Sequence, residues 1–322
     1  MKIAVTGAMG MLGTDMVSEL LHRGYDVVAL YHRNTARRGQ KPGCTECGQV
    51  SHQLDITDLK AVRESIASIR PDAVVNCAAY TWVDDAEADK DSAFAVNALG
   101  PRNLALACRE MGSALLHIST DYVFSGDRDG AYSIWDPPCP VNVYGMSKLW
   151  GENYVRSLMG EYYIVRTSWL FGAHGRNFVQ TMLELGKRHV GYITAGGEGH
   201  AADGDHVLKV VSDQHGSPTY TVDLARACAD LLESRCFGIY HVTNQGVTTW
   251  YDFAKAIFEK AGLTIGLRAV TSEEFPRPAR RPKNSALDPF PLRETIGYLL
   301  PIWDDALGRY LDQIRAESKE ES

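Results

Sequence analysis

The chain has 322 residues, of which 45% are hydrophobic and 23% charged, a composition typical of one large or two modest globular domains. Its net charge is -7 and its pI about 5.8, which argues against a general nucleic-acid binder, because such proteins present a basic face. Seven cysteines, an odd number in a chain of this length, favour a reducing compartment over a disulfide-stapled domain.

The N-terminus begins with the strand-like run MKIAVTGA rather than with a charged leader and an apolar signal core. No apolar run approaches the roughly 18 residues that a membrane span requires. We therefore expect a cytoplasmic protein that binds neither membranes nor nucleic acids.

Short apolar runs alternate with helical patterns through the first half of the chain. The strand-like runs lie at 2–7, 25–32, 50–55, 71–79, 113–120 and 161–172. Because these runs are rich in Val, Ile and Ala and would be buried on both faces, they predict an α/β fold with a Rossmann-like, doubly wound parallel sheet.

After about residue 170 the alternation loosens and helical patterns dominate. We expect helices over 177–188, 221–234, 251–262 and 304–318, and a strand over 238–244. The Gly-rich, polar run 191–205 predicts a flexible loop. The pattern indicates a smaller, helix-rich domain that interleaves with the first.

The run VTGAMGMLG places Gly7, Gly10 and Gly13 where the first strand meets the first helix. Glycine permits a tight turn and close approach of the backbone to a pyrophosphate, which would lie on the helix N-terminus. The spacing is GxxGxxG instead of the GxGxxG of the standard fingerprint, but the strand before it and the helix after it favour nucleotide binding over a simple turn.

The second strand ends in Tyr31, His32 and Arg33, with Arg37 and Arg38 nearby, where an NAD-preferring enzyme usually has Asp or Glu. Cations suit a 2′-phosphate, so the sequence predicts NADPH as the cofactor, with NADH as the alternative. Solvated loop arginines are the other interpretation.

Cys44 and Cys47 form a CxxC in the loop that follows, with His52 as the nearest further candidate ligand. A structural zinc site needs four ligands, and no second CxxC follows. A thiol redox pair is another interpretation, but we favour an ordinary loop.

The strand 113–120 ends in the polar residues Ser119 and Thr120, and Asp121 follows directly. Ligands of open α/β folds bind at the carboxyl ends of strands, so a hydroxyl here can hydrogen-bond a reacting carbonyl oxygen. Capping of a turn is the alternative role.

Tyr144 and Lys148 lie four residues apart in NVYGMSKLWGE, which puts them on one face of a helix. A nearby ammonium lowers the pKa of a phenol, and a phenol tuned in this way can transfer a proton. The same spacing also occurs by chance on many helices.

These motifs resemble the extended short-chain dehydrogenase/reductase superfamily and, within it, the dTDP-4-dehydrorhamnose reductase family. The likeness runs almost from end to end. The glycine pattern and YxxxK are common to the superfamily, whereas STDYVF, RTSWLFG and DQHGSPTY are more specific to this reductase group.

The resemblance implies NADPH-dependent reduction of the C4 ketone of dTDP-4-dehydro-β-L-rhamnose to dTDP-β-L-rhamnose, for cell-surface polysaccharide biosynthesis. It implies that Tyr144 donates the proton, that Lys148 lowers the pKa of Tyr144 and holds the nicotinamide ribose, and that Thr120 completes the catalytic set. Asp121 and Trp169 would contact the sugar together with Thr120.

The expected cofactor-binding residues, including the glycine turn and the cations described above, are Gly7, Gly10, Met11, Leu12, Gly13, His32, Arg33, Asp55, Ile56, Ala78, Ala79, Tyr80, Asn97, Tyr144 and Lys148. For Asn97, a hydrogen bond inside the helix is the alternative role.

The substrate diphosphate needs a cation, and Arg281 in ARRPKNSALD is the candidate, because a planar guanidinium matches phosphate oxygens. Arg280 and Lys283 are rivals, and a solvated basic loop is the alternative. The acidic pattern of Mg²⁺-linked relatives is not matched here, so we expect no required metal, and a monomer or a homodimer.

We interpret residues 1–170 with about 219–247 as the dinucleotide-binding domain, and about 171–218 with 248–322 as the substrate-binding domain. Two other functions stay open: a non-catalytic regulatory subunit of the same fold, and a reductase or epimerase of another nucleotide sugar. The complete set of Thr120, Tyr144 and Lys148 favours catalysis.

Overall fold

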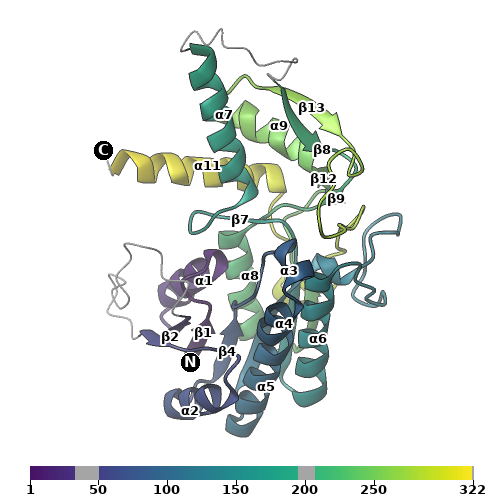
Figure 1. Cartoon of the computed structure of the whole chain (residues 1–322). Helices are drawn as coiled ribbons and strands as arrows, with labels where there is room; N and C mark the ends of the chain where they lie inside the picture. The colour runs from purple at the N-terminus through teal and green to yellow at the C-terminus, as the bar shows by residue number, and fades with distance from the viewer. Residues whose placement is uncertain (33–50, 195–206, 321–322) are drawn as a thin grey trace.

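The computed structural model describes residues 1–32, 51–194 and 207–320 (Figure 1). Within them a central sheet of seven parallel strands has the order β11-β6-β5-β4-β1-β2-β3. Its strands are β1 (Lys2–Thr6), β2 (Asp26–Tyr31), β3 (Ser51–Gln53), β4 (Ala73–Asn76), β5 (Ala114–Thr120), β6 (Tyr162–Thr167) and β11 (Gly238–His241). The strand order reverses at β1 and β4, which confirms the predicted Rossmann-like sheet and places its ligand crevice there.

Helices cover both faces of the sheet (Figure 1). On one face, α1 (Met11–His22) and α8 (Thr221–Ser234) pack through residues such as Met16 and Leu224. On the other face are α2 (Leu59–Ile69), α5 (Gly100–Met111) and α6 (Val143–Leu158). The strands are buried on both sides, which is why their sequences are nearly continuous apolar runs.

In the described chain, four shorter helical elements lie in the segments that follow β4 and β5. These are α3 (Asp85–Ala88), α4 (Lys90–Phe94), the π-helical turn η2 (Ala95–Leu99) and the 3₁₀ turn η3 (Asp121–Val123). A π-helical turn is uncommon and is frequently found at functional sites, so the position of η2 directly before α5 is notable.

A smaller, helix-rich part lies beyond the carboxyl edge of the sheet (Figure 1). Its helices α7 (Phe178–Thr194), α9 (Trp250–Ala261) and α11 (Trp303–Glu320) enclose a core that includes Phe171, Phe253 and Tyr310. In the part of the chain that the structure describes, this smaller part also contains three two-stranded sheets: β7 (Leu170–Phe171) with β10 (Thr219–Tyr220), β9 (His215–Gly216) with β12 (Thr248–Thr249), and β8 (Val207–Val211) with β13 (Gly266–Val270).

The structure departs from the sequence expectation in two places. The helix α7 continues past its expected end at 188, so residues 191–194 are helical and not part of a loop. The short helix α10 (Leu292–Ile296) and Leu300 pack into the core beside the sheet, although the sequence placed them in the smaller domain. The domain boundaries remain an interpretation.

Several expectations fall outside the described residues. They concern Arg33, Arg37, Arg38, Cys44, Cys47 and the rest of the Gly-rich run, 195–206.

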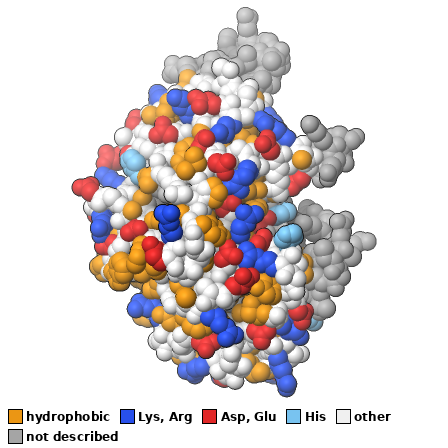
Figure 2. Space-filling model, turned by 180° about the vertical axis from the view of Figure 1, so that it is seen from behind, with side chains coloured by type: hydrophobic (Ala, Val, Ile, Leu, Met, Phe, Trp, Pro, Cys, Tyr) orange, Lys and Arg blue, Asp and Glu red, His pale blue; other side chains and the backbone are white. Residues whose placement is uncertain are grey.

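Among the described residues, none of the helices combines the length and the apolar character that crossing a bilayer requires. On the face shown in Figure 2, acidic and basic side chains are intermixed. That pattern differs from the single-sign basic surface typical of nucleic-acid binders.

Candidate active site

The glycine turn between β1 and α1 is packed too closely to accept side chains. Gly7 has φ +66°, and a Cβ there would lie 2.6 Å from the backbone nitrogen of Ala78. A Cβ on Gly13 would lie 2.1 Å from the carbonyl oxygen of Gly7. The helix begins at Met11 with Gly10 as its N-cap, and its first turn carries no acidic residue. The turn therefore presents backbone N–H groups and a positive helix end, which fit a pyrophosphate.

The segment after β4 lies against this turn and is held by Asn97. The Oδ1 atom of Asn97 accepts a hydrogen bond from the Tyr80 nitrogen at 2.9 Å, and Nδ2 donates to the Tyr80 oxygen at 2.9 Å and to Oγ of Ser147 at 3.0 Å. Each polar atom of this buried amide thus has a protein partner. Asn97 joins the expected cofactor segment 78–80 to α6.

His32, Asp55 and Ile56 lie together where β2 and β3 end. His32 Nε2 is 3.6 Å from Asp55 Oδ2, while Asp55 Oδ1 accepts from the nitrogen and the hydroxyl of Thr57 at 2.9 and 2.8 Å. Burial opposes ionisation, but these hydrogen bonds lower the pKa of Asp55, so it is a carboxylate at neutral pH. Asp55 follows β3, whereas the acidic residue that binds ribose in a dinucleotide-binding fold follows the second strand, so contact of Asp55 with the cofactor stays a prediction.

Thr120 is the point where the expected catalytic residues meet. It ends β5, and its hydroxyl donates to Asp121 Oδ1 at 3.0 Å and accepts from the Tyr122 nitrogen at 3.2 Å. It also shares a hydrogen bond with the phenol of Tyr144, which lies in the first turn of α6. The structure therefore brings Thr120, Asp121 and Tyr144 together, as the sequence predicted.

The expectation that Lys148 lowers the pKa of Tyr144 is wrong for this structure. Burial raises the pKa of Tyr144 to about 12, and only the hydrogen bond with Thr120 acts against that rise. Lys148 instead donates to the carbonyl oxygen of Ile118 at 2.6 Å. Burial also lowers the pKa of the Lys148 ammonium to about 8.

One carboxyl oxygen of Asp121 is buried without a hydrogen bond in the described part of the chain. Its Oδ2 atom has no hydrogen-bond partner among the described residues, although the side chain is only 2% exposed. Burial raises its pKa to about 7, against the opposing effect of nearby hydroxyls, including that of Ser285. A buried, unpaired carboxyl oxygen is costly and indicates a place where a ligand hydroxyl can bind.

Trp169 lies just beyond the end of β6, and its ring is close to α9 and β9. Its ring stacks on Trp250 with centroids 3.6 Å apart and planes 7° from parallel. A Cβ on Gly216 would lie 2.5 Å from the ring. Trp169 also has φ +48°, which is rare for a bulky residue and is often found at functional sites.

Arg281 is already engaged by the protein. Both of its terminal nitrogens contact the carboxylate of Asp84, with Nη2 at 2.9 Å from Oδ2, and the pair lowers the pKa of Asp84 to about 2. Arg281 also shares a hydrogen bond with the phenol of Tyr122. The rivals Arg280 and Lys283 are exposed. Contact of Arg281 with a diphosphate stays a prediction.

Sequence reasoning missed Asp84 and Asn142. Asn142 caps α6 by accepting from the Gly145 nitrogen at 2.8 Å, and it donates to the Arg280 oxygen at 2.7 Å. Both residues tie the C-terminal segment to the site. An Asn directly before a helical pattern is a recognisable cap signal, whereas the ion pair of Asp84 with Arg281 left no signal.

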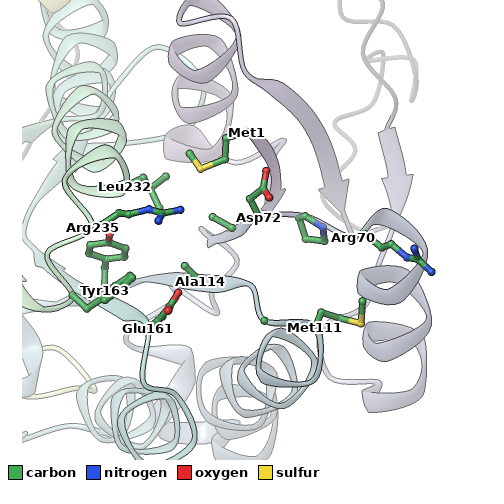
Figure 3. Close-up of a pocket in the computed structure, with 13 residues that line it drawn as sticks. Met1, Arg70, Asp72, Met111, Ala114, Glu161, Tyr163, Leu232 and Arg235 are labelled. Atoms are coloured by element: carbon green, nitrogen blue, oxygen red, sulfur yellow. The ribbon is translucent and has the colours of Figure 1, made fainter.

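A pocket of about 300 Å³ lies away from these residues, at the amino-terminal edge of the sheet (Figure 3). Met1, Ala114 and Tyr163 line it, Arg235 points into it, and Arg70 points away. None of the predicted site residues lines it. In the described part of the chain, no group of three His, Cys, Asp or Glu residues is placed to hold a metal ion.

A family model described as the RmlD substrate binding domain matches residues 1–194 and 199–316. The chain belongs to the RmlD family. This membership confirms the resemblance that the sequence motifs indicated.

Relatives of this chain are named for the reduction of two different substrates. The dTDP-4-dehydrorhamnose reductase of Streptomyces griseus is 44% identical over 88% of this chain and 84% of its own length. A probable dTDP-4,6-dihydroxy-2-methyloxan-3-one 4-ketoreductase of Streptomyces antibioticus is 40% identical over 89% and 86%. The structure of the Bacillus anthracis (strain Ames) dTDP-4-dehydrorhamnose reductase in complex with NADP is 37% identical, covers 97% of this chain and 99% of that one, and has a TM-score of 0.83.

Proposed function

We propose that the protein uses NADPH to reduce the C4 ketone of dTDP-4-dehydro-β-L-rhamnose to dTDP-β-L-rhamnose, a step that supplies cell-surface polysaccharides. The observation that carries this proposal is the meeting of Thr120, Tyr144 and Lys148 at the carboxyl edge of the sheet, beside the glycine turn. Membership of the RmlD family supports the same reaction.

In this reaction the bound NADPH supplies a hydride to C4. Tyr144 gives a proton to the oxygen, on which negative charge develops as C4 is reduced. A pKa of about 12 keeps the phenol protonated at neutral pH, so the proton is in place before the reaction. The hydroxyl of Thr120 lies within hydrogen-bond reach of the phenol, and by turning its single O–H from Asp121 Oδ1 to the phenol oxygen it stabilises the charge left there, an effect larger in the transition state than in the ground state.

The other residues bind and orient. Lys148 uses one N–H for the Ile118 carbonyl, which leaves two donors for the cofactor ribose. Asp121 Oδ2 accepts from a sugar hydroxyl, and Trp169 covers the ring. Arg281 contacts the diphosphate while Asp84 holds its guanidinium in place.

The glycine turn fits the pyrophosphate of the cofactor, and His32 with Arg33 would contact the 2′-phosphate. NADP in the structure of the Bacillus anthracis relative supports NADPH over NADH. We further propose a cytoplasmic enzyme that is a monomer or a homodimer.

The test is oxidation of NADPH against dTDP-, UDP- and GDP-linked 4-keto-6-deoxy sugars, with NMR of the products. Rapid turnover of dTDP-4-dehydro-β-L-rhamnose to the L-rhamno product supports the proposal. Preference for another ketone, such as that named for the Streptomyces antibioticus relative, would redirect it to a neighbouring substrate. Transient oxidation without net consumption of NADPH would indicate an epimerase, and no reaction with any sugar would indicate a regulatory subunit.

A further inference from the structure

Beneath the site, α6 carries a third ionisable residue on the face of Tyr144 and Lys148. Glu152 lies four residues after Lys148, so the two side chains are neighbours on one helix face. Glu152 is fully buried, and Lys148 is 2% exposed. Neither the sequence motifs nor the proposed reaction gives Glu152 a role.

The carboxylate of Glu152 is fixed by three donors on the sheet. The hydroxyl of Ser119 on β5 donates to Oε1 at 2.5 Å, and Arg166 on β6 donates from Nε to Oε1 at 3.0 Å and from Nη2 to Oε2 at 2.7 Å. Arg166 is itself 1% exposed. A bidentate pair with an additional hydroxyl donor holds a carboxylate in one orientation.

The remaining groups around Lys148 carry no charge at neutral pH. Cys77, after β4, is a neutral thiol because burial raises its pKa to about 12. His117 on β5 is neutral because burial lowers its pKa well below the usual value. Tyr144 on α6 is a neutral phenol. In the described part of the chain, Glu152 is the one anionic group among the titratable residues that face Lys148. Its negative charge favours the ammonium form of Lys148.

We propose that Glu152 is a positioning residue for the reductase reaction: held by Ser119 and Arg166, its carboxylate keeps the buried Lys148 in the protonated form that binds the cofactor. The inference rests on the proposed role of Lys148 in holding the ribose. It explains how a lysine that is almost excluded from water stays cationic at neutral pH, since burial alone favours the neutral amine.

The test is the pH dependence of Glu152→Gln. A reaction that needs the Lys148 ammonium slows as the pH rises through the Lys148 pKa, which is about 8. Replacing the anion by an amide removes the negative charge that favours the Lys148 ammonium, so the midpoint of this alkaline loss of kcat/KM should move down by roughly one pH unit or more. A second readout is the Kd of NADPH, followed by fluorescence from pH 6 to 9, which should weaken at correspondingly lower pH.

Two further variants separate positioning from folding. Asp223→Asn removes a carboxylate that is 3% exposed and bidentate to Arg309, at 2.8 and 2.6 Å, but remote from Lys148. It should lower the melting temperature without moving the alkaline midpoint. The double variant Glu152→Met with Arg166→Met removes the pair without leaving an unbalanced charge, so it keeps the fold. It should still show the lowered midpoint.

A double variant that folds and keeps the wild-type midpoint in both readouts would overturn the inference and leave Glu152 a purely structural role. The NADPH-binding readout needs no sugar. A wrong substrate assignment would therefore abolish the turnover signal and leave the binding midpoint intact, so the two failures are distinguishable.

Discussion

The ammonium group of Lys148 donates a hydrogen bond of 2.6 Å to the carbonyl oxygen of Ile118, which lies two residues before Thr120 on the same strand. This bond ties the middle of α6 to the carboxyl end of β5, the two elements that carry Tyr144 and Thr120. The lysine therefore links the helix that carries the proton donor to the strand that carries its hydroxyl partner.

Tyr144→Phe should lower kcat by roughly two to four orders of magnitude, the range for loss of a general acid, with the Kd of NADPH little changed. Single-turnover kinetics and fluorescence titration measure the two effects. Tyr154→Phe, on the outer part of the same helix, is the matched control and should retain wild-type turnover. Near-normal turnover of Tyr144→Phe would remove the proton-donor role.

Asp121 should make the protein less stable as the pH rises. Its folded-state pKa of about 7 lies above the ordinary value of 3.8, so the folded state binds the extra proton between these values. Stability is then lost as the pH rises through about 7, where a buried carboxyl group must ionise.

The free energy of unfolding of Asp121→Asn, relative to that of the wild type, should therefore increase by on the order of 2 kcal/mol when the pH is raised from 5.5 to 8. Melting curves of both proteins at the two pH values test this. The same substitution at the exposed Asp129 should show no such trend. If the stability of the wild type and of Asp121→Asn changed with pH in the same way, this would contradict the ionisation of a buried Asp121.

Gly216→Ala should weaken substrate binding through Trp169. The added Cβ would lie 2.5 Å from the indole ring, and the stacking of this ring on Trp250 restricts its movement away from the new methyl group. We expect KM for the nucleotide sugar to rise about tenfold or more, with the Kd of NADPH unchanged. Gly160→Ala, where the structure has nothing within 4 Å, is the control. An unaltered KM in Gly216→Ala would argue against a sugar contact by Trp169.

Gly13→Ala should abolish tight NADPH binding. Its Cβ would lie 2.1 Å from the Gly7 oxygen, so the turn has to open and its N–H groups lose their alignment. Calorimetry should show an increase in Kd of at least tenfold, since the loss of aligned donors costs more than 1.4 kcal/mol. Gly308→Ala, a helical glycine with open space around it, should bind NADPH normally and gain up to about 1 kcal/mol in stability.

Local patterns in the chain were sufficient for the parallel sheet and for much of the site. Buried runs such as KIAVT admit few arrangements other than a two-sided sheet, and a strand end is where Thr120 had to lie. The spacing of Tyr144 and Lys148 places both on one helix face whatever the rest of the fold.

Contacts between distant segments could not be predicted in this way. Asp84 and Arg281 are 197 residues apart, and nothing in either local pattern indicates that they pair. The longer α7 is a milder case, because residues 191–194 resemble loop in composition and yet continue the helix.

The sequence alone determined the glycine turn, the alternation of strands and helices in the first half of the chain, and the shared helix face of Tyr144 and Lys148, because these depend on periodicity and on which positions tolerate a side chain. Only the tertiary structure decided the charge states. The pKa of Tyr144 depends on burial and on the hydrogen bond with Thr120, and the pKa of Lys148 depends on burial and on Glu152. Burial is created when separate elements pack together.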